Sequence, residues 1–308
     1  MATMRYREAL NQAMREEMRE DESVFLMGED VGVFQGAFKV SEGLLEEFGE
    51  KRVRDTPISE NTIVGMGVGA AMAGLRPIVE ELPKFRFMSG GQCAVPVTVR
   101  SIGGGTGRFG TQHSATGESW FMGLPGLKIA CAGTPAGAYG LLRAAIQEDD
   151  PVLIFEHKGL YGRKGEVLRG EAGIAGVGKA SVDREGTDVT IVSTLLMTDR
   201  SLAAADSLAE QGVSAEVIDL RWLRPLDVDT IRASVEKTGR LVVAEEQVHS
   251  GGWGATVISE LTMGGIEWRR PPRAVSLPEH LLIPYSPTLE DAVIPSAESI
   301  AEAASALL

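Results

Sequence analysis

Short, mostly apolar runs punctuate the first half of the chain, and segments with helical periodicity lie between them. The runs fall at 24–27, 77–80, 95–99, 127–131 and 151–155. Such runs are typical of strands that are buried on both faces of a sheet. Strands that alternate with helices predict an α/β domain that is doubly wound around a mostly parallel sheet.

The same alternation returns in the second half of the chain. Apolar runs at 189–192, 215–218 and 241–244 are again separated by helical segments. The stretch before them is rich in glycine and charge and has little periodicity. We therefore predict two doubly wound domains, 1–157 and 187–308, joined by an interdomain connection at 158–186.

Capping residues predict where several helices begin. Thr3 is placed to cap a first helix in which Tyr6 and later apolar residues recur at helical spacing. Thr134 followed by Pro135 predicts a helix that reaches about residue 147. A last helix is predicted over 296–308.

Composition and charge narrow the class of protein. The 308 residues are 44% hydrophobic, which suits ordinary globular cores, and the formal charge of −13 argues against a general nucleic-acid binder. No apolar run is long enough to span a membrane, and no targeting segment precedes the first helix. Two cysteines, Cys93 and Cys131, build no disulfide framework, so we expect a reducing cytoplasm.

A sharp turn carries the most informative carboxylate. Pro57 biases Thr56 away from helical geometry, and Ser59 or Asn61 can then cap a helix rich in small residues. Glu60 falls in the first turn of that helix, just beyond a strand. It either complements the helix dipole or acts as a functional carboxylate with a shifted pKa.

The glycine-rich stretch at 105–110 matches the dinucleotide pattern G-x-G-x-x-G only superficially. A dinucleotide site needs a helix directly after the glycines and an acid about 20 residues further on, but this sequence predicts a loop at 111–117 and has no such acid. The glycines at 65, 67 and 69 fail as well, because they lie inside a helix. We therefore reject nicotinamide binding and ascribe the helix glycines to close packing.

Two other groups of polar residues invite a functional interpretation. His113 follows the glycine-rich stretch at the predicted edge of a sheet, where α/β proteins bind ligands, so a solvated histidine and a functional one are equally consistent with the sequence. Glu245, Glu246 and His249 are metal-ligand residue types. With no further His or Cys nearby, a strand-end acidic turn is the better account. Trp253 fits either a core or an interface.

Several motifs together resemble the beta subunit of thiamine-diphosphate-dependent 2-oxo acid dehydrogenases, over nearly the whole chain. They are GEDVG at 28–32, GAFKV at 36–40, DTPISE at 55–60, GAAMAGLRP at 69–77, QHS at 112–114, LPGLK at 124–128, DLRWLRPLD at 219–227 and EE at 245–246. The pyruvate and acetoin branches match best, and the branched-chain enzyme follows closely.

The resemblance implies a transketolase-like architecture, with a pyrimidine-binding domain followed by a C-terminal transketolase domain. It implies oxidative decarboxylation of a 2-oxo acid, most closely pyruvate, at a thiamine diphosphate shared with an alpha subunit. Glu60 would donate a hydrogen bond to the aminopyrimidine ring, with Ile58 and Glu29 also binding the cofactor. The alpha subunit would hold the diphosphate and Mg²⁺ through a Gly-Asp-Gly motif, which this chain lacks.

The resemblance also implies partners and a second ion. His113 would act on the lipoyl sulfur or the reacting intermediate. The lipoyl group would belong to a dihydrolipoamide acyltransferase, and two alpha and two beta chains would form a heterotetramer. A structural potassium ion (K⁺) would be bound mainly by backbone carbonyl groups, at Val97, Ala145, Ile146, Glu148 and Asp150.

One departure from the family pattern affects the function. After Glu80 the family has an apolar helix that gives an aromatic contact to the pyrimidine, and about 15 residues, roughly four turns, are absent here. The gap is either a true deletion or a disordered segment that was left out before the residues were numbered. The direct Glu80–Glu81 junction favours the second alternative. A true deletion would favour a non-catalytic, transketolase-like interaction protein. Acetoin and branched-chain 2-oxo acids are the candidate substrates besides pyruvate.

Overall fold

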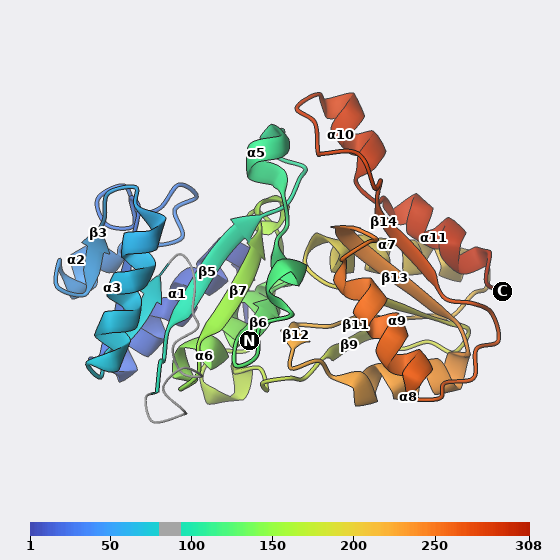
Figure 1. The fold of residues 1–308 in the computed structure, drawn as a ribbon, viewed down its shortest axis with the longest axis horizontal. Coiled ribbons are helices and arrows are strands. Elements are labelled where there is room, and N and C mark those ends of the chain that lie inside the picture. The colour runs from blue at the N-terminus through green and yellow to red at the C-terminus, as the bar shows by residue number, and fades with distance from the viewer. Residues whose placement is uncertain (80–93) are drawn as a thin grey trace. The chain divides into compact units, whose positions relative to one another are not determined.

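The computed structural model of the chain describes residues 1–79 and 94–308, apart from the side chains of Glu60 and Asn61 (Figure 1). The predicted loss of a helix after Glu80 lies outside these residues. The described chain divides into two compact units. The first contains Met1–Ser101, Gly123–Glu156 and Leu160–Val177, and the second contains Ile102–Met122, His157–Gly159 and Gly178–Leu308.

The first unit is organised around a sheet in the order β6-β7-β5-β4-β2-β3. These strands are β2 (Val24–Gly28), β3 (Val53–Asp55), β4 (Arg76–Val79), β5 (Thr98–Gly103), β6 (Lys128–Cys131) and β7 (Val152–His157). The pairs β2–β3, β2–β4, β4–β5 and β6–β7 are all parallel. Because the carboxyl ends of parallel strands meet at one edge, the loops after β2 and β3 are neighbours.

Helices cover this sheet, and a small antiparallel ribbon lies beside it. The helices are α1 (Tyr6–Glu20), α2 (Leu44–Phe48), α3 (Glu60–Met72) and α6 (Pro135–Gln147), with the 3-10 helix η3 at Glu171–Gly173. The ribbon pairs β1 (Ala2–Arg5) with β8 (Lys164–Val167). Thr3 therefore lies in a strand and α1 begins at Tyr6, because pairing with β8 keeps the first residues extended. Thr134 does cap α6, accepting the Gly137 N–H.

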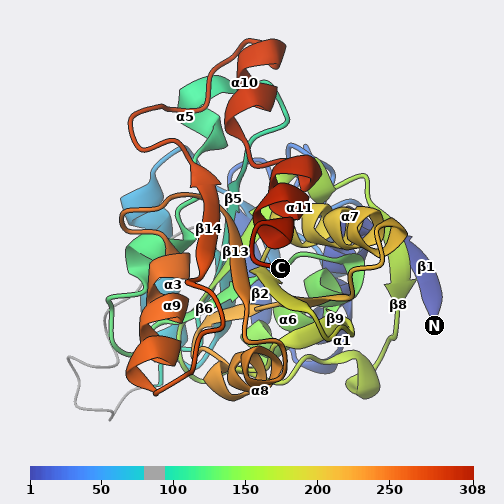
Figure 2. The same cartoon turned by 90° about the vertical axis from the view of Figure 1, so that its right-hand side faces the viewer.

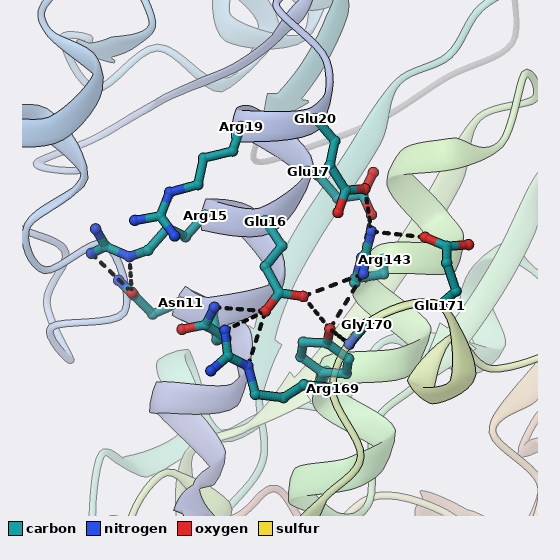
Figure 3. A network of polar contacts seen from close by, with 12 residues as sticks. Asn11, Arg15, Glu16, Glu17, Arg19, Glu20, Arg143, Arg169, Gly170 and Glu171 are labelled. Atoms are coloured by element: carbon teal, nitrogen blue, oxygen red, sulfur yellow. Dashed lines mark hydrogen bonds and ion pairs between the residues drawn. The ribbon is translucent and has the colours of Figure 1, made fainter. Parts of the chain in front are cut away.

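A buried polar network joins α1 to α6 in this unit (Figure 3). Arg143 of α6 is completely buried, and its guanidinium donates to Glu17, to Glu20 at 2.5 Å and to Glu16 at 3.3 Å. Tyr139 donates to Glu16 and accepts the Gly170 N–H, while Arg169 binds Glu16 from the loop after β8. The network fastens two helices and a loop around one buried cation.

The second unit has a five-stranded sheet in the order β14-β13-β10-β11-β9, parallel except at β9. Its strands are β9 (Ser181–Arg184), β10 (Val189–Ser193), β11 (Ala215–Asp219), β13 (Leu241–Val248) and β14 (Arg273–Leu277). Figure 2 shows α7 (Leu196–Glu210) and α11 (Ala297–Ser305) on one face and α8 (Val228–Thr238) and α9 (Trp253–Met263) on the other. This doubly wound α/β arrangement confirms the predicted fold class.

Shorter elements complete this unit. They are α5 (Gly110–Ser114), α10 (Pro287–Val293), β12 (Trp222–Arg224) and the 3-10 helices η1 (Glu118–Phe121) and η2 (Lys158–Leu160). The prediction of a loop at 111–117 is wrong in its first part, which the short helix α5 occupies. Trp253 is fully buried, so it belongs to the core of the unit.

No helix in the described part of the chain has the length and hydrophobicity needed to cross a membrane.

Candidate active site

The loops after β2 and β3 bring two of the predicted cofactor-binding residues to one edge of the first unit. Glu29 directly follows β2 and is partly buried, whereas Ile58 lies beyond β3 and is 78% exposed. An exposed isoleucine and a carboxylate on neighbouring loops suit an apolar ligand ring that carries a polar edge.

Asp55 fastens these two loops to each other. Its carboxylate accepts the Gly32 N–H at 2.6 Å and the Val33 N–H at 3.1 Å. The Thr56 N–H donates to the Gly28 carbonyl at 2.9 Å, which continues the pairing of β2 and β3. The aspartate was visible in the sequence as part of the DTPISE motif, but its partners are 22 and 23 residues away and no local pattern indicates them.

Glu60 is the first residue of α3, as the capping argument predicts. Ser59 occupies the N-cap position, but its hydroxyl donates to the Thr62 hydroxyl at 2.7 Å and makes no side-chain cap bond. The backbone therefore places Glu60 two residues after Ile58, at the start of α3. Its side chain is outside the described part of the structure.

His113 belongs to the second unit, where it lies in the last turn of α5 and is exposed. The following residue, Ser114, is buried and fixes one side of this short helix. Glu29 and Ile58 thus follow two neighbouring strands of the first unit, while His113 belongs to the second.

The loop that carries His113 rests on a buried acidic residue of β13. Glu246 accepts the Gly105 N–H at 2.6 Å and pairs with His157 Nε2 at 2.9 Å. Burial favours its neutral form, but His157, the Gly105 N–H and Arg200 together hold the pKa of Glu246 below its ordinary value. Glu245 and Glu246 lie inside β13, so the expectation of a strand-end acidic turn is wrong: the strand continues to Val248.

A third buried acid, Glu118, lies in the same unit. Burial, with the nearby charges of Glu246 and Glu245, raises the pKa of Glu118 to about 8. Its Oε2 atom has no hydrogen-bond partner among the described residues. The buried surroundings therefore favour the neutral form of Glu118, and nothing in the sequence around it predicted this.

The five residues of the predicted potassium site lie in the first unit, at the carboxyl end of α6 and on the segment leading into β5. The carbonyl groups of Ile146 and Glu148 accept hydrogen bonds from Arg76 Nη1 at 3.3 and 3.0 Å. Lys128 binds the carboxylates of Glu148 and Asp150. Two side-chain cations thus already bind at this corner, and a metal ion would share its carbonyl ligands with Arg76.

Comparison with known families places the chain in the transketolase-like class. Residues 2–164 match the transketolase pyrimidine-binding domain and residues 178–300 match the transketolase C-terminal domain. A solved structure of a split gene transketolase, described as an inactive beta4 tetramer, has the same fold, with a TM-score of 0.79 and 23% identity over 98% of both chains.

Within this class the chain belongs to the family of E1 beta subunits of thiamine-dependent 2-oxo acid dehydrogenases, which confirms the resemblance. It is 40% identical to the pyruvate dehydrogenase E1 beta subunit of Rhizobium meliloti, over the whole chain and 70% of the relative. It is 42% identical to the mitochondrial beta-2 subunit of Oryza sativa subsp. japonica, over 98% and 85%. The beta subunit of the acetoin:2,6-dichlorophenolindophenol oxidoreductase of Cupriavidus necator is 40% identical, over 96% and 95%.

The alignment with the Rhizobium meliloti protein covers 323 positions, more than the 308 residues of this chain. That relative therefore has residues that this chain lacks.

Proposed function

We propose that this chain is the beta subunit of a pyruvate dehydrogenase first component, which decarboxylates a 2-oxo acid oxidatively and acylates a lipoyl group. The observation that carries the proposal is the whole-chain identity of 40–42% to pyruvate dehydrogenase beta subunits. The loop edge that presents Glu29 and Ile58 supports it, because this edge lies at the carboxyl ends of parallel strands, where such sheets bind ligands.

The residues at this edge fit the aminopyrimidine end of thiamine diphosphate. Ile58 is apolar and 78% exposed, so it can pack on a ring, and Glu29 offers a carboxylate beside it. Glu60, two residues after Ile58, would hydrogen-bond a ring nitrogen and share its proton there. When bound, the cofactor supplies an acceptor for the electrons left by the loss of CO₂.

The remaining parts of the site are proposed to come from partners. The chain has no Gly-Asp-Gly sequence, so an alpha subunit would hold the diphosphate and Mg²⁺. Two alpha and two beta chains would form the enzyme. His113, exposed on α5, would orient or protonate the sulfur of a lipoyl group delivered by a dihydrolipoamide acyltransferase. Potassium at the end of α6 stays part of the proposal as a structural ion.

Acetoin is the second candidate substrate, because an acetoin oxidoreductase beta subunit is as similar as some pyruvate dehydrogenase subunits. A substrate panel on the complex reconstituted with its alpha subunit distinguishes the two. Pyruvate, acetoin and branched-chain 2-oxo acids would each be supplied, and product formation measured. If the complex turns over acetoin and not pyruvate, acetoin is its substrate.

Glu60→Gln tests the role of this chain in catalysis, and Glu50→Gln, at an exposed position, is the matched control. We expect Glu60→Gln to abolish decarboxylation while the complex still assembles, as judged by size-exclusion chromatography. Glu50→Gln should turn over normally. Full activity of the Glu60→Gln complex would remove Glu60 from the mechanism, and an inactive wild-type complex would favour a non-catalytic interaction protein.

A further inference from the structure

We propose that Glu246 is a positioning residue that holds the loop carrying His113. His157 keeps the Glu246 carboxylate ionised, with each of its two oxygens accepting a hydrogen bond. The inference rests on the role given to His113 in the proposed function. All of the contacts that support it lie within the second unit.

One residue of β13 holds both ends of the loop between Gly103 and Thr116. The Glu246 side chain accepts the Gly105 N–H at 2.6 Å, and the Glu246 carbonyl accepts the Thr116 hydroxyl at 2.6 Å. The two ends also touch each other, since a Cβ at Gly103 would lie 2.6 Å from the Ala115 carbonyl oxygen. The loop is therefore closed at its base and seated on a buried strand.

Neighbouring contacts fasten the loop at two further points. Gln247 Nε2 donates to the Thr116 carbonyl at 2.7 Å, which reinforces the base. Farther out, Arg108 donates to Glu290 at 2.5 Å and to Asp291 at 2.8 Å, and α5 and α10 lie side by side in Figures 1 and 2. His113 sits between these fastenings, so its position depends on both.

The protonation state of the buried pair follows from the hydrogen bonds. The Gly159 N–H can only donate, and it points at His157 Nδ1 at 3.0 Å, so Nδ1 carries no proton. The proton of neutral His157 is therefore on Nε2, where it is donated to Glu246 Oε2 at 2.9 Å. One carboxylate oxygen receives the loop and the other receives the imidazole, which is why both must be acceptors.

This arrangement also accounts for the glycines that mimic a dinucleotide motif. Gly104 has a φ of +89°, and a Cβ there would overlap the His157 ring. A Cβ at Gly105 would overlap Ile294. Glycine is needed because the backbone packs directly on the pair and on the end of α10, and no phosphate is required to explain it.

Glu246→Gln is the test, because an amide cannot replace this carboxylate. In either orientation its NH₂ group would face another donor, the Gly105 N–H or the His157 Nε2–H. If His157 instead carried its proton on Nδ1, that N–H would face the Gly159 N–H. Glu245→Gln is the matched control on the same strand. Glu245 accepts the Gly254 N–H and the Ser276 hydroxyl, and that hydroxyl can rotate to accept from an amide.

Hydrogen exchange over 104–116 and steady-state kinetics of the reconstituted complex give the readouts. We expect Glu246→Gln to speed exchange in this segment and to lower kcat, each by about tenfold, the effect of losing one charge-assisted hydrogen bond. KM for the 2-oxo acid should change less than twofold. Glu245→Gln should leave exchange in 104–116 and kcat unchanged.

His113→Ala separates failure of this inference from failure of the proposed function. Unchanged exchange in Glu246→Gln overturns the anchoring itself. Faster exchange with unchanged kcat, while His113→Ala is slow, overturns the link between anchoring and catalysis. Full activity of His113→Ala would instead refute its proposed role in the reaction, and with it the catalytic part of this inference.

Discussion

Replacing Arg143 with methionine should destabilise the first unit more than any surface charge change. Arg143 is the buried centre of the network that joins α1 to α6 (Figure 3). Methionine keeps much of the aliphatic volume but removes the charge. Among the described residues, Glu17, which is 4% exposed, then loses its cation and keeps the Gln147 amide at 2.9 Å.

The expected cost can be worked from the partners that remain. Breaking a buried ion pair costs about 3–5 kcal/mol, because an uncompensated charge is left inside. Glu16 retains Arg169 at 2.6 Å and the Glu20 side chain is 52% exposed, so only Glu17 is stranded. We therefore expect the lower end, about 3 kcal/mol, which for a unit of this size lowers the Tm by roughly 6–12 °C.

The loss should depend on pH. Burial raises the pKa of Glu17, and its bonds with Arg143 oppose that rise. Without Arg143 the pKa goes higher, so the variant is penalised most at pH values where Glu17 is ionised in the unfolded state. The deficit should be large at pH 8 and shrink as pH falls toward the ordinary carboxyl pKa.

Calorimetry and urea unfolding at pH 5 and pH 8 would measure this deficit. Arg169→Met, at the exposed rim of the same network, is the matched control and should cost at most about 1 kcal/mol. An Arg143→Met chain that melts within about 1 °C of Arg169→Met would refute the reasoning, as would a deficit that grows toward pH 5.

Three further outcomes are expected. Because the folded pKa of Glu118 is about 8, above its unfolded value, wild-type stability should fall by about 2 kcal/mol between pH 6 and pH 8, and Glu118→Gln should flatten this slope in urea titrations. Gly104→Ala should lower the free energy of unfolding by at least about 2 kcal/mol, and Gly212→Ala by about 1 kcal/mol. Both glycines have positive φ, but only a Cβ at Gly104 would clash with a neighbour. Equal losses in the two variants would contradict the packing of Gly104 on His157. If potassium binds at the end of α6, KCl should raise the Tm above that in an equal concentration of tetramethylammonium chloride, and identical curves would remove the ion.

The fold could be predicted because its signals are local. Mostly apolar runs of four or five residues indicated the strands, and Thr134-Pro135 indicated the start of α6. The prediction that Thr3 caps the first helix was wrong because Thr3 lies in β1. The partner strand of β1, β8, is about 160 residues away in the sequence. A capping preference worth about 1 kcal/mol yields to such a non-local pairing.

The candidate site was only partly predictable for the same reason. The motif around Glu60 and the histidine at 113 could be recognised from adjacent residues. The anchor formed by Glu246 joins residues separated by 89, 130 and 141 positions, and no sequence spacing reports it. The raised pKa of Glu118 was unpredictable for the same reason, since it depends on what packs around that side chain.

The division of the chain has a practical consequence for dissecting it. Because Ile102–Met122 and His157–Gly159 belong to the second unit, the polypeptide passes between the two units five times. A gene fragment starting at residue 178 would encode the second sheet without the loop 102–122, which covers buried acids such as Glu246. Recombination between homologues at that single point would combine the C-terminal sheet of one parent with the loop segments 102–122 and 157–159 of the other.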